Sequence, residues 1–143
     1  MNDIKKIERA CIEFKIGYEI LSKEKAIQII EFVVNKFNVQ KITGHLAINT
    51  NDSISIPFEK YEFSYATYLN DEPIFLFFDQ ESTDRNSVIK INSAKKMSVI
   101  MENSWGMEYF VTNESFSYLL AVNWYVIEGI GDAKKWMKKL GSE

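Results

Sequence analysis

The chain has 143 residues, of which 46% are hydrophobic and 26% charged, and its formal net charge is −3. These values are typical of a globular protein, so we expect one domain over residues 1–143. A single cysteine, Cys11, and a single histidine, His45, exclude a disulfide framework, a zinc finger and a multi-histidine metal site. No apolar run approaches the roughly 18 residues of a membrane span, and the N-terminus is charged rather than signal-like, so we expect a cytoplasmic protein.

The N-terminal part of the chain predicts two helices. Residues 2–14 carry apolar side chains at helical spacing, and Cys11 lies on that stripe as a small buried hydrophobe. A second helix is expected to begin after Ser22, a suitable N-cap, and to cover residues 24–37. Because its polar stripe is narrow, we expect this helix to be covered on most sides and to be more buried than the helices at 2–14 and 132–140.

From residue 41 onwards the hydrophobic period shortens towards two, which predicts strands. The strands expected in this part cover residues 45–48, 53–56, 61–69, 74–78 and 88–91. The run at 74–78 is continuously apolar, which is typical of a central strand covered on both faces. A polar loop follows it at 79–86.

The C-terminal part predicts a helix from Ser93 to about Gly106, a strand at 107–112 and a last helix after Asp132. Residues 117–130 fit two strands or one buried helix, and their β-branched and aromatic content favours two strands. Runs of strands with segregated helices predict an α+β fold. We expect N-terminal helices packed on a mainly antiparallel sheet, with an inserted helix and a C-terminal helix.

Charge is distributed unevenly along the chain. Residues 51–85 carry eight acidic and two basic side chains, and residues 101–132 carry five acidic and no basic ones. Such stretches repel a phosphate backbone and attract a basic protein, so we expect a protein partner and no nucleic acid. The acids fit a hydrated loop surface or a docking surface. A carboxylate pair for catalysis and a calcium site remain as further alternatives.

The candidate partner-binding residues combine these acids with aromatic side chains. They are Asp71, Glu72, Asp79, Glu81, Asp84, Glu108, Trp124 and Tyr125. We expect the 79–84 loop to lie on the same side of the sheet as Glu108 or Trp124. An expected hairpin tip carries Trp124 and Tyr125, where either core packing or a partner would account for them. No residue is assigned to catalysis, a cofactor or a metal.

The other two tryptophans and two short motifs have structural interpretations. We expect Trp136 in the core and Trp105 packed under the sheet edge. The segment Gly129-Ile130-Gly131 precedes a helix, as phosphate-binding turns do, but the third glycine is missing and Asp132 places a carboxylate where an anion would bind. It therefore predicts a tight turn. His45 would act as a general base only with a carboxylate distant in the sequence.

The C-terminal half resembles a known group of proteins. Its expected strands at 74–79, 88–91, 106–113 and 118–121 lead to the turn and helix that run from Gly129 to Trp136. Over residues 70–140 this pattern is similar to that of small α+β proteins found beside polymorphic toxins in bacteria, many of them immunity proteins. The resemblance implies a cytoplasmic, non-catalytic protein that binds and neutralises a cognate toxin. A structural or scaffolding domain and a small hydrolase using carboxylates are the alternatives.

Overall fold

The computed structural model describes residues 2–141. In chain order its elements are α1 (Asp3–Glu13), β1 (Tyr18–Ile20), α2 (Lys23–Phe37), β2 (Ile54–Pro57), α3 (Phe58–Tyr61), η1 (Tyr65–Tyr68), β3 (Ile74–Phe77), β4 (Ile89–Ile91), η2 (Ala94–Lys96), α4 (Met97–Ser104), β5 (Tyr109–Asn113), β6 (Tyr118–Val122), β7 (Val126–Gly131) and α5 (Lys134–Gly141). Every strand pair is antiparallel, and the seven strands lie in the order β1-β4-β3-β5-β6-β7-β2. The predicted α+β fold is confirmed.

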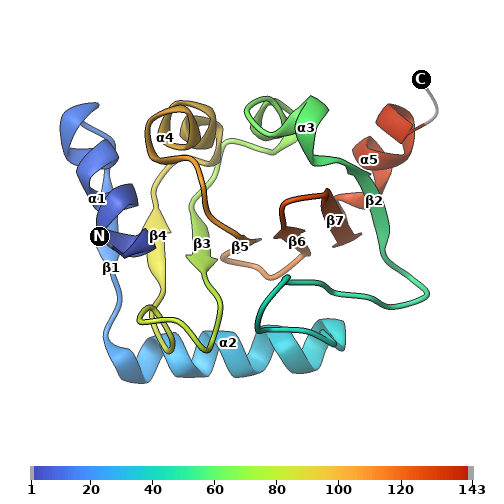
Figure 1. Cartoon of the computed structure of the whole chain (residues 1–143), viewed down its shortest axis with the longest axis horizontal. Coiled ribbons are helices and arrows are strands. Elements are labelled where there is room, and N and C mark those ends of the chain that lie inside the picture. The colour runs from blue at the N-terminus through green and yellow to red at the C-terminus, as the bar shows by residue number, and fades with distance from the viewer. Residues whose placement is uncertain (1, 142–143) are drawn as a thin grey trace.

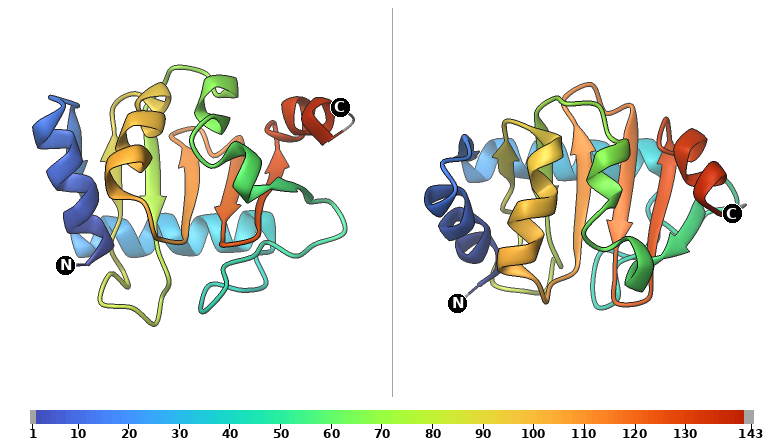
Figure 2. Two further views of the ribbon diagram at one scale, coloured as in Figure 1. Left: turned by 45° about the horizontal axis from the view of Figure 1, so that its top comes forward. Right: turned by 90° about the horizontal axis from the view of Figure 1, so that it is seen from above.

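The sheet is the middle of three layers (Figure 1). The single helix α2 crosses one face, and α1, α4, α3 and α5 lie side by side over the other (Figure 2). Alternate residues of each strand therefore enter two different cores. In β6, Leu120 and Val122 pack under the four helices, whereas Leu119 and Ala121 face α2. Burial on both faces explains why β3, β5 and β6 are buried at every position.

Both N-terminal helices begin at side-chain caps, and the predicted cap Ser22 is confirmed. The Asn2 side chain accepts from the Lys5 N–H at 3.1 Å, and the Ser22 hydroxyl accepts from the Lys25 N–H at 3.3 Å. The prediction that residues 24–37 form the most enclosed helix is wrong. Four of the fifteen residues of α2 are buried, against four of eleven in α1, and Phe32 is 52% exposed.

Two of the expected strands are not strands. Residues 61–69 form the end of α3 and η1, and their buried side chains are Tyr61, Tyr65, Ala66 and Leu69, which is a helical rather than an alternating spacing. Residues 45–48 lie in a long loop, where a bridge joins Lys41 to Ala47 and the Gln40 N–H donates to the Ile48 carbonyl oxygen. Leu46 and Ile48 are nevertheless buried, because this loop covers the α2 face of the sheet.

Residues 117–130 form the strands β6 and β7 and the turn between them, so the favoured interpretation as strands is confirmed. The last strand, β7, ends in Gly131, which has a φ of +75°. A Cβ atom there would lie 2.4 Å from the Ser117 carbonyl oxygen, so this turn requires glycine for steric reasons. In the part of the chain that the structure describes, no helix has the length and apolar character needed to cross a membrane.

Candidate functional site

Exposed aromatic side chains gather at one end of the sheet. The connection from α4 to β5 carries Trp105, and the turn from β6 to β7 carries Trp124 and Tyr125; both lie at the same end (Figure 2). Their exposed fractions are 69%, 46% and 69%. The imidazole of His45 meets the Tyr125 ring edge-on, with 5.3 Å between the centroids. We call Trp105, Trp124, Tyr125 and His45 the aromatic end.

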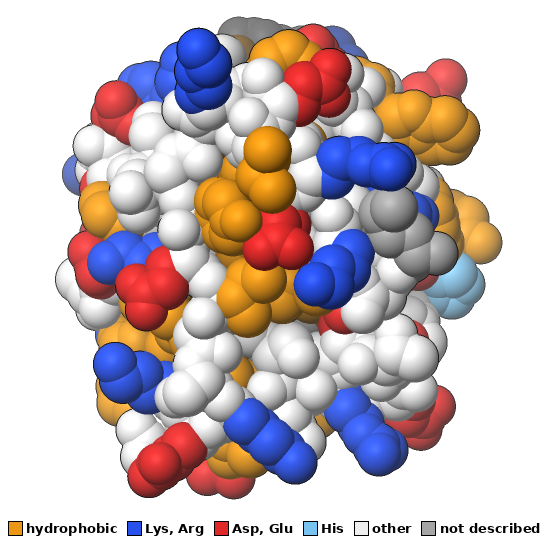
Figure 3. Space-filling model, turned by 90° about the vertical axis from the view of Figure 1, so that its left-hand side faces the viewer, with side chains coloured by type: hydrophobic (Ala, Val, Ile, Leu, Met, Phe, Trp, Pro, Cys, Tyr) orange, Lys and Arg blue, Asp and Glu red, His pale blue; other side chains and the backbone are white. Residues whose placement is uncertain are grey.

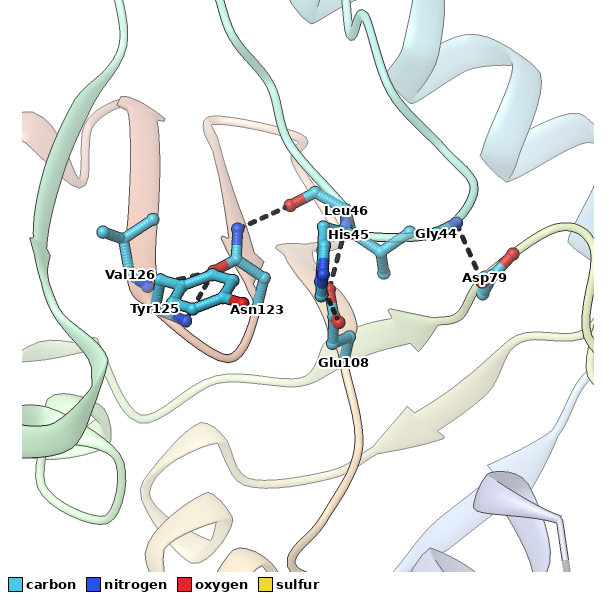
Figure 4. Close-up of polar contacts among 8 residues, drawn as sticks. All are labelled: Gly44, His45, Leu46, Asp79, Glu108, Asn123, Tyr125 and Val126. Carbon is cyan, nitrogen blue, oxygen red and sulfur yellow. Dashed lines mark hydrogen bonds and ion pairs between the residues drawn. The ribbon is translucent and has the colours of Figure 1, made fainter.

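A carboxylate holds His45 in this place. Glu108, just before β5, accepts from the Leu46 N–H and contacts His45 Nδ1, both at 2.9 Å (Figure 4). Because an ionised carboxylate only accepts, the imidazole donates from Nδ1 in this contact. Glu108 is only 9% exposed as a side chain, whereas His45 is half-exposed. The distant carboxylate that a histidine base would need is therefore present.

Two more side chains fasten the same loop to the sheet. Asp79, just beyond β3, accepts from the Gly44 N–H at 3.0 Å. Asn123 donates to the Leu46 carbonyl oxygen at 3.0 Å and accepts from the Tyr125 and Val126 N–H groups (Figure 4). One side chain thus fixes both the loop and the turn that presents Tyr125, which makes the aromatic end a supported surface rather than a free tip.

A fourth anchor was missed at the sequence level. Glu128, in the middle of β7, is buried and accepts from the backbone N–H groups of Ile48 and Asn49, both at 2.7 Å, and from the Ser53 hydroxyl. Its only sequence signal is a carboxylate inside an otherwise apolar strand, between Ile127 and Gly129. A buried charge at such a position requires several donors, and here a loop about 80 residues away provides them.

The predicted acidic residues divide between structural and exposed positions. Asp84 is 2% exposed and accepts from the Asp3 N–H at the start of α1, so it acts as a cap. Burial and the nearby Asp84 carboxylate raise the pKa of Asp3. Glu81 is exposed in the loop that leaves the sheet at the aromatic end. The 79–84 loop therefore lies at the same end as Glu108 and Trp124.

Asp71 and Glu72 lie at the opposite end of the sheet, before β3. The Asp71 carboxylate accepts from the Ser93 hydroxyl, and Glu72 accepts from the Asn113 amide at 2.6 Å. These two residues do not join the aromatic end.

The expectation that Trp105 packs under the sheet edge is wrong, because its side chain is exposed. Trp136 is only partly buried and stacks on Tyr68.

Other surfaces differ from the aromatic end in composition. On the side formed by α1 and β1, apolar side chains form a strip interrupted by both positive and negative charges (Figure 3). Cys11 lies on the buried face of α1, and burial raises the pKa of its thiol to about 11. Among residues 2–141, no three His, Cys, Asp or Glu side chains come together as metal ligands would.

Comparison of the chain with protein-family models, with curated proteins and with solved structures finds no match.

Proposed function

We propose that this chain is a protein-binding module whose docking surface is the aromatic end. The observation that carries the proposal is the exposure of Trp105, Trp124 and Tyr125 on one supported end of the sheet. Tryptophan and tyrosine dominate the binding energy of protein interfaces, and large apolar rings are costly to leave in water. The anchors at Glu108 and Asn123 hold this surface in place before binding, which lowers the entropic cost of association.

The charge of this end favours a basic partner. Glu81 and Glu102 are exposed in segments that reach the aromatic end, and Asp79 is half-buried beside Glu81. Acidic side chains around an aromatic anchor accelerate the approach of a basic surface, while the anchor slows dissociation. In keeping with the resemblance over residues 70–140, we infer that the partner is a bacterial toxin domain and that binding neutralises it.

A catalytic alternative rests on one contact, the hydrogen bond between His45 and Glu108. A carboxylate that orients an imidazole is one part of a general-base arrangement. The same bond also fixes the loop that carries His45, and the loop explanation accounts for the Leu46 contact as well. Replacement of His45 by alanine distinguishes the catalytic role from the structural role, because only the catalytic role predicts that an enzymatic activity is lost.

The experiment begins with purification of the tagged protein from its native host to obtain the partner. Single substitutions Trp105→Ala, Trp124→Ala and Tyr125→Ala are then compared with Phe14→Ala, an exposed aromatic residue at the end of α1. We expect at least one variant of the aromatic end to weaken binding by about tenfold or more, as interface anchors do, and the Phe14 variant to bind as the wild type does. Equal binding by all four would place the interface elsewhere.

A second measurement separates neutralisation from binding. The partner is produced in a surrogate bacterium with and without the wild-type chain. Growth arrest that the wild type relieves and the weakest-binding variant does not relieve is the expected result. If the partner does not affect growth, the protein-binding role stands and the assignment of a toxin as the partner is wrong.

A further inference from the structure

The opposite end of the sheet contains a cavity that the docking surface does not use. It has a volume of about 480 Å³ and lies between η1 and α5, which cover the same face of the sheet (Figure 2). Asn113, Ser117 and Tyr118 line it from the strands below. Ligand pockets are commonly about 300–1,000 Å³, so the cavity is large enough for a small metabolite.

One wall of the cavity is aromatic. Tyr68, at the end of η1, stacks on Trp136 of α5 with 5.4 Å between the ring centroids and 12° between the ring planes. Both residues line the cavity, together with Leu69. Tyr68 is partly exposed. The two stacked rings cover one face of each other, and the apolar surface that they leave at the cavity favours a planar ring as its ligand.

The other lining groups are polar and of two kinds. Lys135 and Lys139, on α5, place two positive charges at the cavity, and lysine is a common phosphate ligand. Asp132, just before α5, provides a carboxylate that accepts hydrogen bonds from amino groups. Asn113 donates to the Ser117 hydroxyl at 2.8 Å and accepts from the Ser117 N–H at 2.9 Å, so these two side chains are held in place.

A buried phenol adjoins the same space. Tyr118 is only 6% exposed, and among the described residues its hydroxyl has no hydrogen-bond partner. Burial, followed by the charge of Glu72, raises the pKa of this hydroxyl, so it remains a neutral donor. An unpaired buried donor is costly in a native protein, and its pairing with a water or ligand oxygen is the usual explanation.

We propose that this cavity binds a nucleoside monophosphate. The base lies against the wall formed by Tyr68 and Trp136, its N–H groups face Asp132, and its phosphate contacts Lys135. A ligand with only a planar ring would leave Lys135 uncontacted, and inorganic phosphate would leave the aromatic wall uncontacted. This site is separate from the aromatic end, because β6 and β7 run from one to the other.

Calorimetric titration of the full chain with AMP, GMP, CMP and UMP tests the proposal. We expect at least one nucleotide to bind with a Kd below about 1 mM. The matching nucleoside, which lacks the phosphate, and ribose 5-phosphate, which lacks the base, are each expected to bind at least about tenfold more weakly, because each loses one set of contacts. Absence of binding by all four nucleotides would overturn the proposal.

Two surface substitutions test the location. Tyr68→Ala and Lys135→Gln are expected to weaken nucleotide binding by about tenfold each, while Lys138→Gln, on the same helix but outside the lining of this cavity, leaves it unchanged. Circular dichroism and the urea midpoint show whether each variant is folded. Wild-type affinity in both folded cavity variants would contradict the site, and tighter binding of a tetranucleotide than of the mononucleotide would assign the site to a nucleic acid strand instead.

Discussion

Buried and half-buried carboxylates hold the long connection between α2 and β2 against the sheet. Glu108 accepts from Leu46, Asp79 from Gly44, and Glu128 from Ile48 and Asn49. These bonds satisfy backbone N–H groups of a loop that has almost no regular pairing of its own. The acidic residues of this chain therefore stabilise its longest connection, besides charging its surface.

Replacement of Glu128 by glutamine tests this role. The amide nitrogen of glutamine cannot accept from the backbone N–H groups that the Glu128 carboxylate pairs with, so we expect a loss of about 2–3 kcal/mol in the free energy of unfolding. Urea denaturation measures it. Glu114→Gln is the matched control, since Glu114 is half-exposed and pairs with Lys90 at 3.2 Å; its cost is expected to be under about 1 kcal/mol. Equal costs in the two variants would contradict the anchoring role.

The exposed pair of Asp52 and Lys134 makes stability depend on pH. The hydrogen bond and charge of Lys134 lower the pKa of Asp52 below its ordinary value of 3.8. An acid whose folded pKa is lowered stabilises the fold above its unfolded pKa and loses that contribution as the pH falls through the folded pKa. We therefore expect the difference in urea midpoint between the wild type and Asp52→Asn to be largest near neutral pH and to disappear well below pH 3.8.

At the scale of elements, α2 buries mainly one face although it has apolar residues on several sides. Ile30 is buried against the sheet, whereas Phe32 is half-exposed and touches Phe116 with 4.9 Å between the ring centroids. We expect Ile30→Ala to cost about 2–5 kcal/mol in the free energy of unfolding and Phe32→Ala to cost at most about 1.5 kcal/mol. A urea midpoint that responds equally to both would mean that α2 is enclosed on both sides.

Elements with a strong local pattern could be predicted from the sequence. The apolar run at 74–78 is a central strand, and the predicted cap Ser22 begins α2. Residues 61–69 could not be assigned in this way, because aromatic residues that alternate along the sequence also satisfy a helical turn. The burial of α2 was overestimated, since the sequence does not show that only one layer covers it.

At the scale of the whole molecule, the chain presents different chemistry at the two ends of its sheet. One end carries Trp105, Trp124 and Tyr125 with exposed acids, and the other carries the cavity beside the lysines of α5. The charge and aromatic content of the sequence pointed to some of the residues at the first end. The structural role of Asp84 depends on the start of α1, which is 81 residues away, and the cavity depends on η1, which was predicted as a strand.

Charge reversal tests the steering role of the acidic end. Asp84 is unsuitable for this purpose because its carboxylate caps α1. Glu81→Lys combined with Glu102→Lys changes two exposed side chains instead. We expect slower association with the partner and a weaker dependence of the association rate on salt, while the urea midpoint stays within about 0.5 kcal/mol of the wild type. An unchanged association rate at low salt would mean that these acids only hydrate the surface.

Amide hydrogen exchange in the complex with the co-purified partner tests the docking surface most directly. If the aromatic end is the interface, binding will slow exchange in the segments 43–46, 105–108 and 123–126, which surround the exposed rings. Exchange at 68–70 and 132–136, around the cavity, will remain as in the free protein. Slowed exchange confined to the cavity, or to α1 and β1, with none in the three segments of the aromatic end, would contradict the proposed interface.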